Sequence, residues 1–233
     1  MLSSSKRFPL PDTYTPSVNA IGQTFRKRPW VSVMLAISAV ALDFALVHQY
    51  AGEVRACFAL VGFALAIYLS DDDQRSLGLR ASPVQGWLPW ISTSLKIGCI
   101  VAVCVIVGLG TWVATGHSLK LHVTEPSLIG SRFVHMCFVA PVVEESIYRI
   151  SACGLIAAIV GHRQTIAING ILFGALHVWY GNASPENLIG GFFLAWSFLK
   201  SETILVPFIL HSGGNMLVLA AQIAVWYVGV LNG

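Results

Sequence analysis

The sequence predicts an all-α membrane protein, a polytopic bundle of about seven or eight transmembrane helices of roughly 20 residues each. Hydrophobic residues make up 55% of its 233 residues and charged residues only 11%, against about a quarter in an ordinary soluble domain. The mean hydropathy is +0.71. So few charges cannot cover the surface of a soluble protein of this size. The strands of a membrane β-barrel would alternate and would be far less apolar.

Charge and cysteine content exclude several classes of function. The net charge is +3 and the basic residues are scattered, so no nucleic-acid-binding face is predicted. The five cysteines lie apart within apolar segments and form no CxxC pair, which indicates neither a thiolate metal site nor a disulfide framework. The composition does predict contact with the lipid bilayer, whereas no pattern predicts an oligomeric state.

The N-terminal half begins with a polar, Pro-rich segment at residues 1–29, which we expect to be cytoplasmic because lysine and arginine are more frequent on its side of the membrane. The apolar run that follows is long enough to span and is read as an uncleaved first helix. A short turn at residues 51–55 and a polar interlude at 70–89 separate the later spans. The N-terminal transmembrane region, residues 30–115, is expected to hold spans at about 30–50, 56–69 and 90–115.

The C-terminal half, residues 128–233, is expected to form a catalytic transmembrane core. Its first apolar segment continues through small residues to about residue 160, and turns then separate the later ones. The last segment is long enough to be two pieces if it breaks at Gly213-Gly214, which would give the eighth span. The spans are expected at about 133–160, 165–180, 188–199 and 203–231.

Ionisable residues within the apolar stretch FVHMCFVAPVVEESIYRI, residues 133–150, indicate where function lies. Charges at membrane depth are costly, so they usually face a bundle interior. Glu145 and Arg149 are four residues apart and can pair on one helix face, which leaves Glu144 without a partner in its own segment. Pro141 should kink this helix and free a carbonyl near the carboxylates.

Two later segments can supply partners for Glu144. Burial makes a carboxylate a better base near neutral pH, so Glu144 is a candidate general base for a water molecule. His177 can hold that water or carry its proton. His211 and Asn215 are four residues apart, so both side chains can point at one oxygen, as in an oxyanion hole. Each residue alone also has a structural explanation, because histidine and asparagine often join membrane helices by hydrogen bonds.

These residues resemble the three motifs of the CPBP family, also called the Abi or CAAX-protease-like family. The motifs are Glu144-Glu145-x-x-x-Arg149, then Phe173-x-x-x-His177, then His211-x-x-x-Asn215. The likeness covers about residues 139–219. Members include the eukaryotic CAAX prenyl endopeptidase and bacterial proteins linked to bacteriocin maturation and self-immunity. Each motif alone is weak, but three in order with suitable gaps are specific.

The resemblance implies a glutamate-dependent intramembrane endopeptidase that needs no cofactor, acting on a peptide or a membrane-anchored protein. A multi-pass protein of a bacterial inner membrane is the expected location. Carried over from the motifs, Glu144 is the base, His177 helps to activate the water, and His211 with Asn215 stabilises the oxyanion. The residues that support the site are then Glu145, Arg149 and Phe173.

Three alternatives stay open. Glu144, His177 and His211 could together bind zinc, since glutamate and histidine are also zinc ligands. A non-catalytic immunity or binding protein could keep the same fold. A small proton-coupled transporter could use Glu144 and His177 as a proton relay, although no inverted repeat is visible in the sequence.

Overall fold

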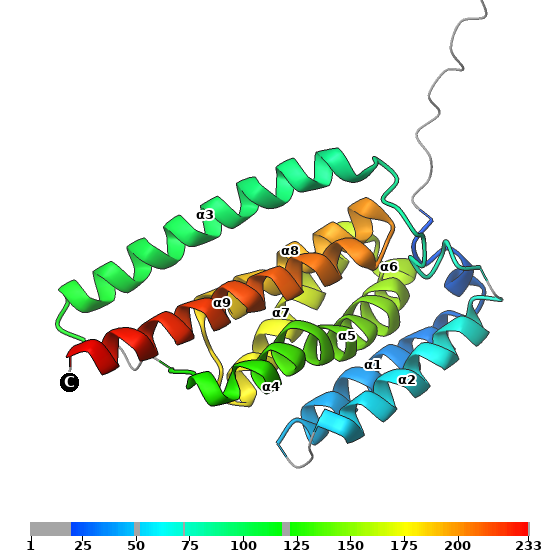
Figure 1. Cartoon of the computed structure of the whole chain (residues 1–233). Coiled ribbons are helices and arrows are strands. Elements are labelled where there is room, and N and C mark those ends of the chain that lie inside the picture. Colours follow the sequence, from blue (N-terminus) through cyan, green and yellow to red (C-terminus); the bar gives the residue numbers. More distant parts are fainter. Residues whose placement is uncertain (1–19, 49–51, 72, 118–121, 233) are drawn as a thin grey trace, which may run out of the picture.

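The computed structural model in Figure 1 describes residues 20–48, 52–71, 73–117 and 122–232. Within these residues the protein is helical, and its β structure is limited to one isolated antiparallel bridge between Leu79 and Thr203. The predicted all-α class is therefore confirmed for the part of the chain that the structure describes. Residues 1–19, the larger part of the predicted N-terminal polar segment, lie outside the described residues.

Five helical segments of the described chain are long and apolar enough to cross a membrane. They support a multi-pass membrane protein, but the predicted number of seven or eight spans is not confirmed. Two further helices, α7 (His162–Trp179) and α8 (Pro185–Ser201), are short or carry too many polar residues to qualify. The five candidate spans are Pro29–Leu46, Gly52–Leu69, Trp87–Ala114, Pro126–Val160 and Leu205–Gly229.

Helices α1 (Pro29–Leu46) and α2 (Gly52–Leu69) pack side by side at one flank of the bundle (Figure 1). The predicted second span began near residue 56, and this was wrong, because α2 already begins at Gly52. An acidic residue, Glu53, occupies the first turn, where it favours helix formation through the macrodipole. Because α2 begins at Gly52, Arg55 lies within this helix and not in a preceding turn.

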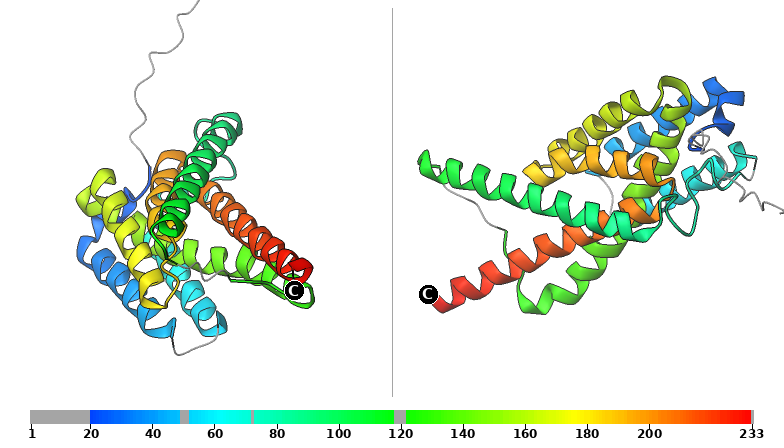
Figure 2. Two further views of the ribbon diagram at one scale, coloured as in Figure 1. Left: turned by 90° about the vertical axis from the view of Figure 1, so that its left-hand side faces the viewer. Right: turned by 90° about the horizontal axis from the view of Figure 1, so that it is seen from above.

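The helix α3 (Trp87–Ala114) lies at the outside of the bundle and diverges from α9 toward the C-terminal ends of both, as the right-hand view of Figure 2 shows. All residues of α3 are described, and Trp90 alone among them is buried. Trp90 packs against Trp196 with ring centroids 5.4 Å apart. Just before α3, the amide of Gln85 donates to the carbonyl of Lys200 at 2.9 Å. The helix is thus anchored at its N-terminal end.

The segment that carries the glutamate pair is one continuous helical segment, Pro126–Val160, which we call the motif helix. It passes between the α1–α2 pair and helices α7 to α9 (Figure 1). Two of its stretches are π-helical, a form that is frequent at functional sites. Its parts are η2 (Pro126–Leu128), α4 (Ile129–Val134), η3 (His135–Val139), α5 (Ala140–Glu145), η4 (Ser146–Cys153) and α6 (Gly154–Val160).

The last helix, α9 (Leu205–Asn232), runs without interruption. The predicted possible break at Gly213-Gly214 does not occur, and the eighth span that it would have created is absent from the described chain. Both glycines have open space where a Cβ would lie, so neither marks a close backbone approach. The cost of about 1 kcal/mol per helical glycine is small for a long apolar helix.

Helices α7 and α8 pack closely because glycines face aromatic rings across their interface. A Cβ at Gly191 would lie 2.8 Å from the Cβ of Phe173 and 3.0 Å from the carbonyl oxygen of Gly170. A Cβ at Gly170 would in turn lie 2.5 Å from the ring of Phe192. This interface fixes the position of Phe173, which belongs to the second sequence motif.

The neighbouring glycines of α8 provide a direct test of that packing. We expect Gly191→Ala to lower the stability of the protein by about 1–3 kcal/mol, the usual cost of overpacking against backbone and a fixed ring. The matched control is Gly190→Ala, where a Cβ meets no atom within 4 Å. Thermal unfolding in detergent checks both variants. Equal melting temperatures for the two would show that the close approach does not constrain α8.

Candidate functional site

The two glutamates of the motif helix meet a single imidazole of α9. Glu144 and Glu145 are buried, with 5% and 1% of their surfaces exposed. The Nδ1 atom of His211 lies 2.8 Å from Oε1 of Glu145, and its Nε2 atom lies 3.7 Å from Oε2 of Glu144. Side chains of adjacent helix residues point in different directions, so the imidazole of His211 lies between the carboxylates of Glu144 and Glu145. The predicted proximity of Glu144 and His211 is thus observed.

Glu145 is fully engaged by basic neighbours. Its second oxygen, Oε2, accepts a hydrogen bond from Nε of Arg149 at 2.9 Å, as the spacing of four residues predicted. Arg149 has no exposed surface, and its guanidinium lies over the ring of Phe173 at 5.1 Å from the centroid. One carboxylate oxygen of Glu145 binds Arg149 and the other binds His211, so Glu145 joins the motif helix to α9. The oxygens of Glu144 make no hydrogen bond to these residues and stay available to another partner.

A residue that the sequence reasoning missed, Asn169 of α7, is a second hydrogen-bond partner of Arg149. Its Oδ1 accepts a hydrogen bond from Nη1 of Arg149, and its Nδ2 donates to the carbonyl of Tyr148 at 2.8 Å. The sequence did hold a signal for this role. Residues 169, 173 and 177 are spaced by four and share one face of α7, so an asparagine in line with Phe173 and His177 points at the same site.

Two more residues that the sequence reasoning did not assign to the site come from α1 and α2. Arg55 donates from Nε to Oδ1 of Asp43 at 2.7 Å and from Nη2 to Oδ2 at 3.2 Å. The same Nη2 atom lies 3.7 Å from Oε1 of Glu144. The hydroxyl of Tyr148 donates to Oδ2 of Asp43 at 3.1 Å. Sequence reasoning placed Arg55 in a turn, so its approach to Glu144 could not be anticipated.

His177 lies on the buried face of α7 and is oriented by its own helix. Its Nδ1 atom is 2.9 Å from the carbonyl oxygen of Phe173, which can only accept, so Nδ1 carries the hydrogen and Nε2 is left for other partners. The ring lies between Phe173 and Tyr180, with centroid distances of 4.4 and 5.0 Å. The ring of Phe173 also faces that of His211, with centroids 5.8 Å apart, so His177 and His211 both lie near Phe173. The predicted approach of His177 to Glu144 stays a prediction.

Asn215 holds α9 against the π-helical turn of the motif helix. Its Nδ2 donates to the carbonyl of Met136 at 2.7 Å. In this stretch the backbone bonds run from residue i+5 to residue i, as Ala140 N–H to the carbonyl of His135 shows. The matching donor for Met136 would be Pro141, which has no N–H. Pro141 thus frees a carbonyl, as predicted, but the carbonyl is that of Met136, eight residues before Glu144, and not one beside the carboxylates. The side chain of Asn215 donates to it.

Glu144 and His211 form the chemically useful centre of this arrangement, because Glu144 can accept a proton and His211 offers its Nε2 beside it. Asn215 contacts Met136 and keeps a second hydrogen on Nδ2, and its predicted action with His211 on one oxygen stays a prediction. Among the described residues, no group of three or more His, Cys, Asp or Glu side chains is placed to hold a metal ion. The alternative of a zinc site at Glu144, His177 and His211 therefore has no preformed ligand set there, and it stays a prediction to be tested.

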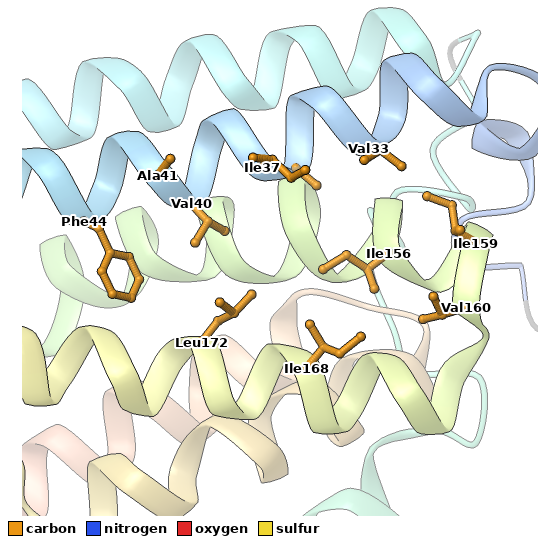
Figure 3. A pocket seen from close by; sticks show the side chains of 11 residues that line it. Val33, Ile37, Val40, Ala41, Phe44, Ile156, Ile159, Val160, Ile168 and Leu172 are labelled. Atoms are coloured by element: carbon orange, nitrogen blue, oxygen red, sulfur yellow. The ribbon is translucent and has the colours of Figure 1, made fainter.

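An apolar cavity lies away from the polar residues around Glu144. It has a volume of about 490 Å³ and opens between α1, α6 and α7 (Figure 3). Its lining is entirely apolar, from Val33 and Phe44 on α1 to Ile156 on α6 and Leu172 on α7. Without an ionisable or hydrogen-bonding side chain it offers no group for catalysis, so the candidate active site is the polar cluster around Glu144.

The link between Pro141 and Asn215 can be tested by a double-mutant cycle. We expect Asn215→Ala to cost about 1–3 kcal/mol, because it leaves the partly buried carbonyl of Met136 unpaired among apolar helices. Pro141→Ala supplies a backbone N–H that can take this carbonyl. The loss caused by Asn215→Ala should therefore be smaller in the Pro141→Ala background. Unfolding in detergent measures all four proteins, and strictly additive losses would contradict the link.

One family of known proteins matches the part of the chain that carries these residues. Residues 126–217 match the family model described as type II CAAX prenyl endopeptidase Rce1-like. No curated protein and no solved structure gives a match. The matched segment runs from the start of the motif helix into α9 and holds the three motifs in order. The resemblance to the CPBP, or CAAX-protease-like, family that the three motifs predicted is thus confirmed over residues 126–217.

Proposed function

We propose that this protein is an intramembrane endopeptidase in which Glu144 activates a water molecule. The observation that carries the proposal is the difference between the two buried glutamates. Glu145 is bound through both oxygens by Arg149 and His211. Glu144 is approached by Arg55 and His211 only at 3.7 Å, beyond hydrogen-bond distance. It therefore keeps lone pairs for a water, as a general base must.

In the proposed reaction, Glu144 takes one proton from water while the water oxygen attacks the carbonyl carbon of the scissile peptide bond. The carbonyl oxygen becomes an oxyanion, which the Nε2–H of His211 in its imidazolium form and the second hydrogen of Asn215 Nδ2 stabilise, while Nδ1–H of His211 stays on Glu145. The tetrahedral intermediate then collapses, the C–N bond breaks, and the proton held by Glu144 goes to the leaving nitrogen. His177, through its free Nε2, orients the water. No residue forms a covalent intermediate.

The remaining charged residues support this chemistry. Asn169 holds Arg149, Arg149 holds Glu145, and Glu145 in turn holds Nδ1 of His211. The tautomer and orientation of His211 are set by such a partner, as for histidine in other catalytic groups. We propose a peptide or a membrane-anchored protein segment as substrate, because the site lies among apolar helices, and a bacterial inner membrane as location.

The proposal predicts different effects for the two glutamates. Glu144→Gln keeps the size and removes the base, so cleavage should fall by about 10²–10⁴-fold. Its loss of stability should be smaller than that of Glu145→Gln, because Arg55 and His211 keep Asp43 and Glu145 as partners. Glu145→Gln breaks a buried ion pair with Arg149, so its main effect should be loss of stability, about 3–5 kcal/mol. The measurement compares new protein termini in membranes and secreted peptides at matched expression, together with melting temperatures of the purified proteins.

Termini that appear with the wild type and vanish with Glu144→Gln and with His211→Ala would identify the substrate as well as the activity. Identical termini in all strains, with a phenotype that survives Glu144→Gln, would favour the non-catalytic immunity protein. Uptake driven by a pH gradient without any cleaved product would favour the transporter.

Removal of metal provides an independent prediction. We expect cleavage to continue unchanged after exhaustive dialysis against EDTA and 1,10-phenanthroline, because Glu144 activates the water by accepting its proton. Metal content of the active protein, measured by mass spectrometry, should be well below one ion per chain. Loss of cleavage that added zinc restores would instead establish the zinc alternative at Glu144, His177 and His211.

A further inference from the structure

The α1–α2 pair lies outside the segment that matches the family model, yet it contributes a cation to the candidate base. Arg55 of α2 approaches Oε1 of Glu144 to 3.7 Å, while His211 approaches the other oxygen at the same distance. The carboxylate thus lies between two basic groups from opposite sides of the motif helix. One of them, His211, belongs to the family motifs. The other comes from residues before the matched range of 126–217.

Arg55 is held in a defined orientation. Asp43, which is only 2% exposed, accepts two hydrogen bonds from its guanidinium, the bidentate geometry that fixes an arginine most strongly. Asp43 also accepts the hydroxyl hydrogen of Tyr148, a residue of the motif helix. The chain of contacts runs from Tyr148 through Asp43 and Arg55 to Glu144, and it returns to the helix from which it started. The position of Arg55 is therefore coupled to the position of Glu144.

The length of the contact determines what Arg55 can do. At 3.7 Å the guanidinium attracts the carboxylate without using a lone pair in a hydrogen bond. In a medium of low dielectric constant such an attraction is strong, whereas at an exposed site it would count for little. Arg55 can thus hold the Glu144 carboxylate in place and balance its charge, and it leaves the oxygen available to water.

We propose that Arg55, oriented by Asp43, is a positioning residue for Glu144, and that the α1–α2 pair is therefore a working part of the catalytic unit. The inference rests on the proposed function of Glu144. The simpler explanation is a salt bridge that only joins α1 to α2. A salt bridge with that purpose needs Asp43 and Arg55 but no contact between Arg55 and Glu144. A measurement made at Glu144 itself therefore distinguishes the two explanations.

The side chain of Arg55 can be varied without overfilling the core. Together with Asp43 and the buried hydroxyl of Ser151, it lines a cavity of about 160 Å³ between α1, α2 and the motif helix. Arg55→Gln removes the charge, and Arg55→Lys keeps it. A matched control is Arg80→Gln, because Arg80 makes a similar 3.6 Å contact with Glu202 at a different place.

The primary readout is labelling of Glu144 in the full-length protein by dicyclohexylcarbodiimide, which reacts with protonated carboxyl groups in apolar surroundings. Site-resolved mass spectrometry measures the labelled fraction of each carboxyl group. Loss of an adjacent cation favours the protonated acid, so Arg55→Gln should raise labelling of Glu144 by about tenfold or more. Arg55→Lys should restore most of the wild-type resistance, and Arg80→Gln should leave Glu144 unchanged.

Glu144-dependent cleavage provides the second readout. It should fall by at least about tenfold in Arg55→Gln, in line with the labelling change, and recover in Arg55→Lys. If Arg55→Gln does not fold, Asp43→Asn serves instead. It keeps one oxygen acceptor, replaces the other with an NH2 donor and removes the charge that orients Arg55, while Arg55 itself stays charged, so labelling of Glu144 should rise by a smaller factor.

Unchanged labelling of Glu144 in folded Arg55→Gln would overturn the proposal, as would faster cleavage, which would make Arg55 an inhibitory contact. Equal increases at Glu144 and Glu145 would indicate general loosening and count against positioning. The labelling result does not depend on any substrate. If no terminus depends on Glu144 but its labelling still responds to Arg55, then the proposed protease function fails while the coupling between the two residues stands.

Discussion

The pairing of buried charges is the constraint on which the rest of this structure depends. An unpaired charge among apolar helices is costly, and removing one partner of a buried pair typically costs about 3–5 kcal/mol. Each charged group of the site touches a group of opposite sign on another turn or another helix. The network ties together α1, α2, the motif helix and α9, and it reaches α7 through Asn169. Its charged and titratable members are Asp43, Arg55, Glu144, Glu145, Arg149 and His211.

The π-helical turn of the motif helix provides the second link between helices. A proline within a helix leaves a carbonyl without a donor, and such a carbonyl is costly among apolar side chains. Here the π register moves that free carbonyl to Met136, where the amide of Asn215 pairs with it. The same asparagine then lies one helical turn from His211. A backbone defect in one helix thus fixes the position of site residues on another.

Glu144 and Glu145 are adjacent in one helix, and they differ in the residues that surround them. Arg149 and His211 bind both oxygens of Glu145, so this residue holds the site together. Glu144 is surrounded by basic groups that stay beyond hydrogen-bond distance. This difference is the basis for assigning the proposed chemistry to Glu144. It also means that Arg55, from a part of the chain outside the family match, belongs to the surroundings in which that chemistry would occur.

The sequence by itself determined the all-α membrane class, the Glu145–Arg149 pair and the approach of His211 to Glu144. These features follow from composition, from spacing along one helix face and from motifs in a fixed order. The tertiary structure alone decided that Asp43 and Arg55 join the site, and that α9 stays unbroken at its two glycines. The physical reason is that contacts between distant helices depend on which faces meet. Periodicity within one segment predicts a face but not the partner that covers it.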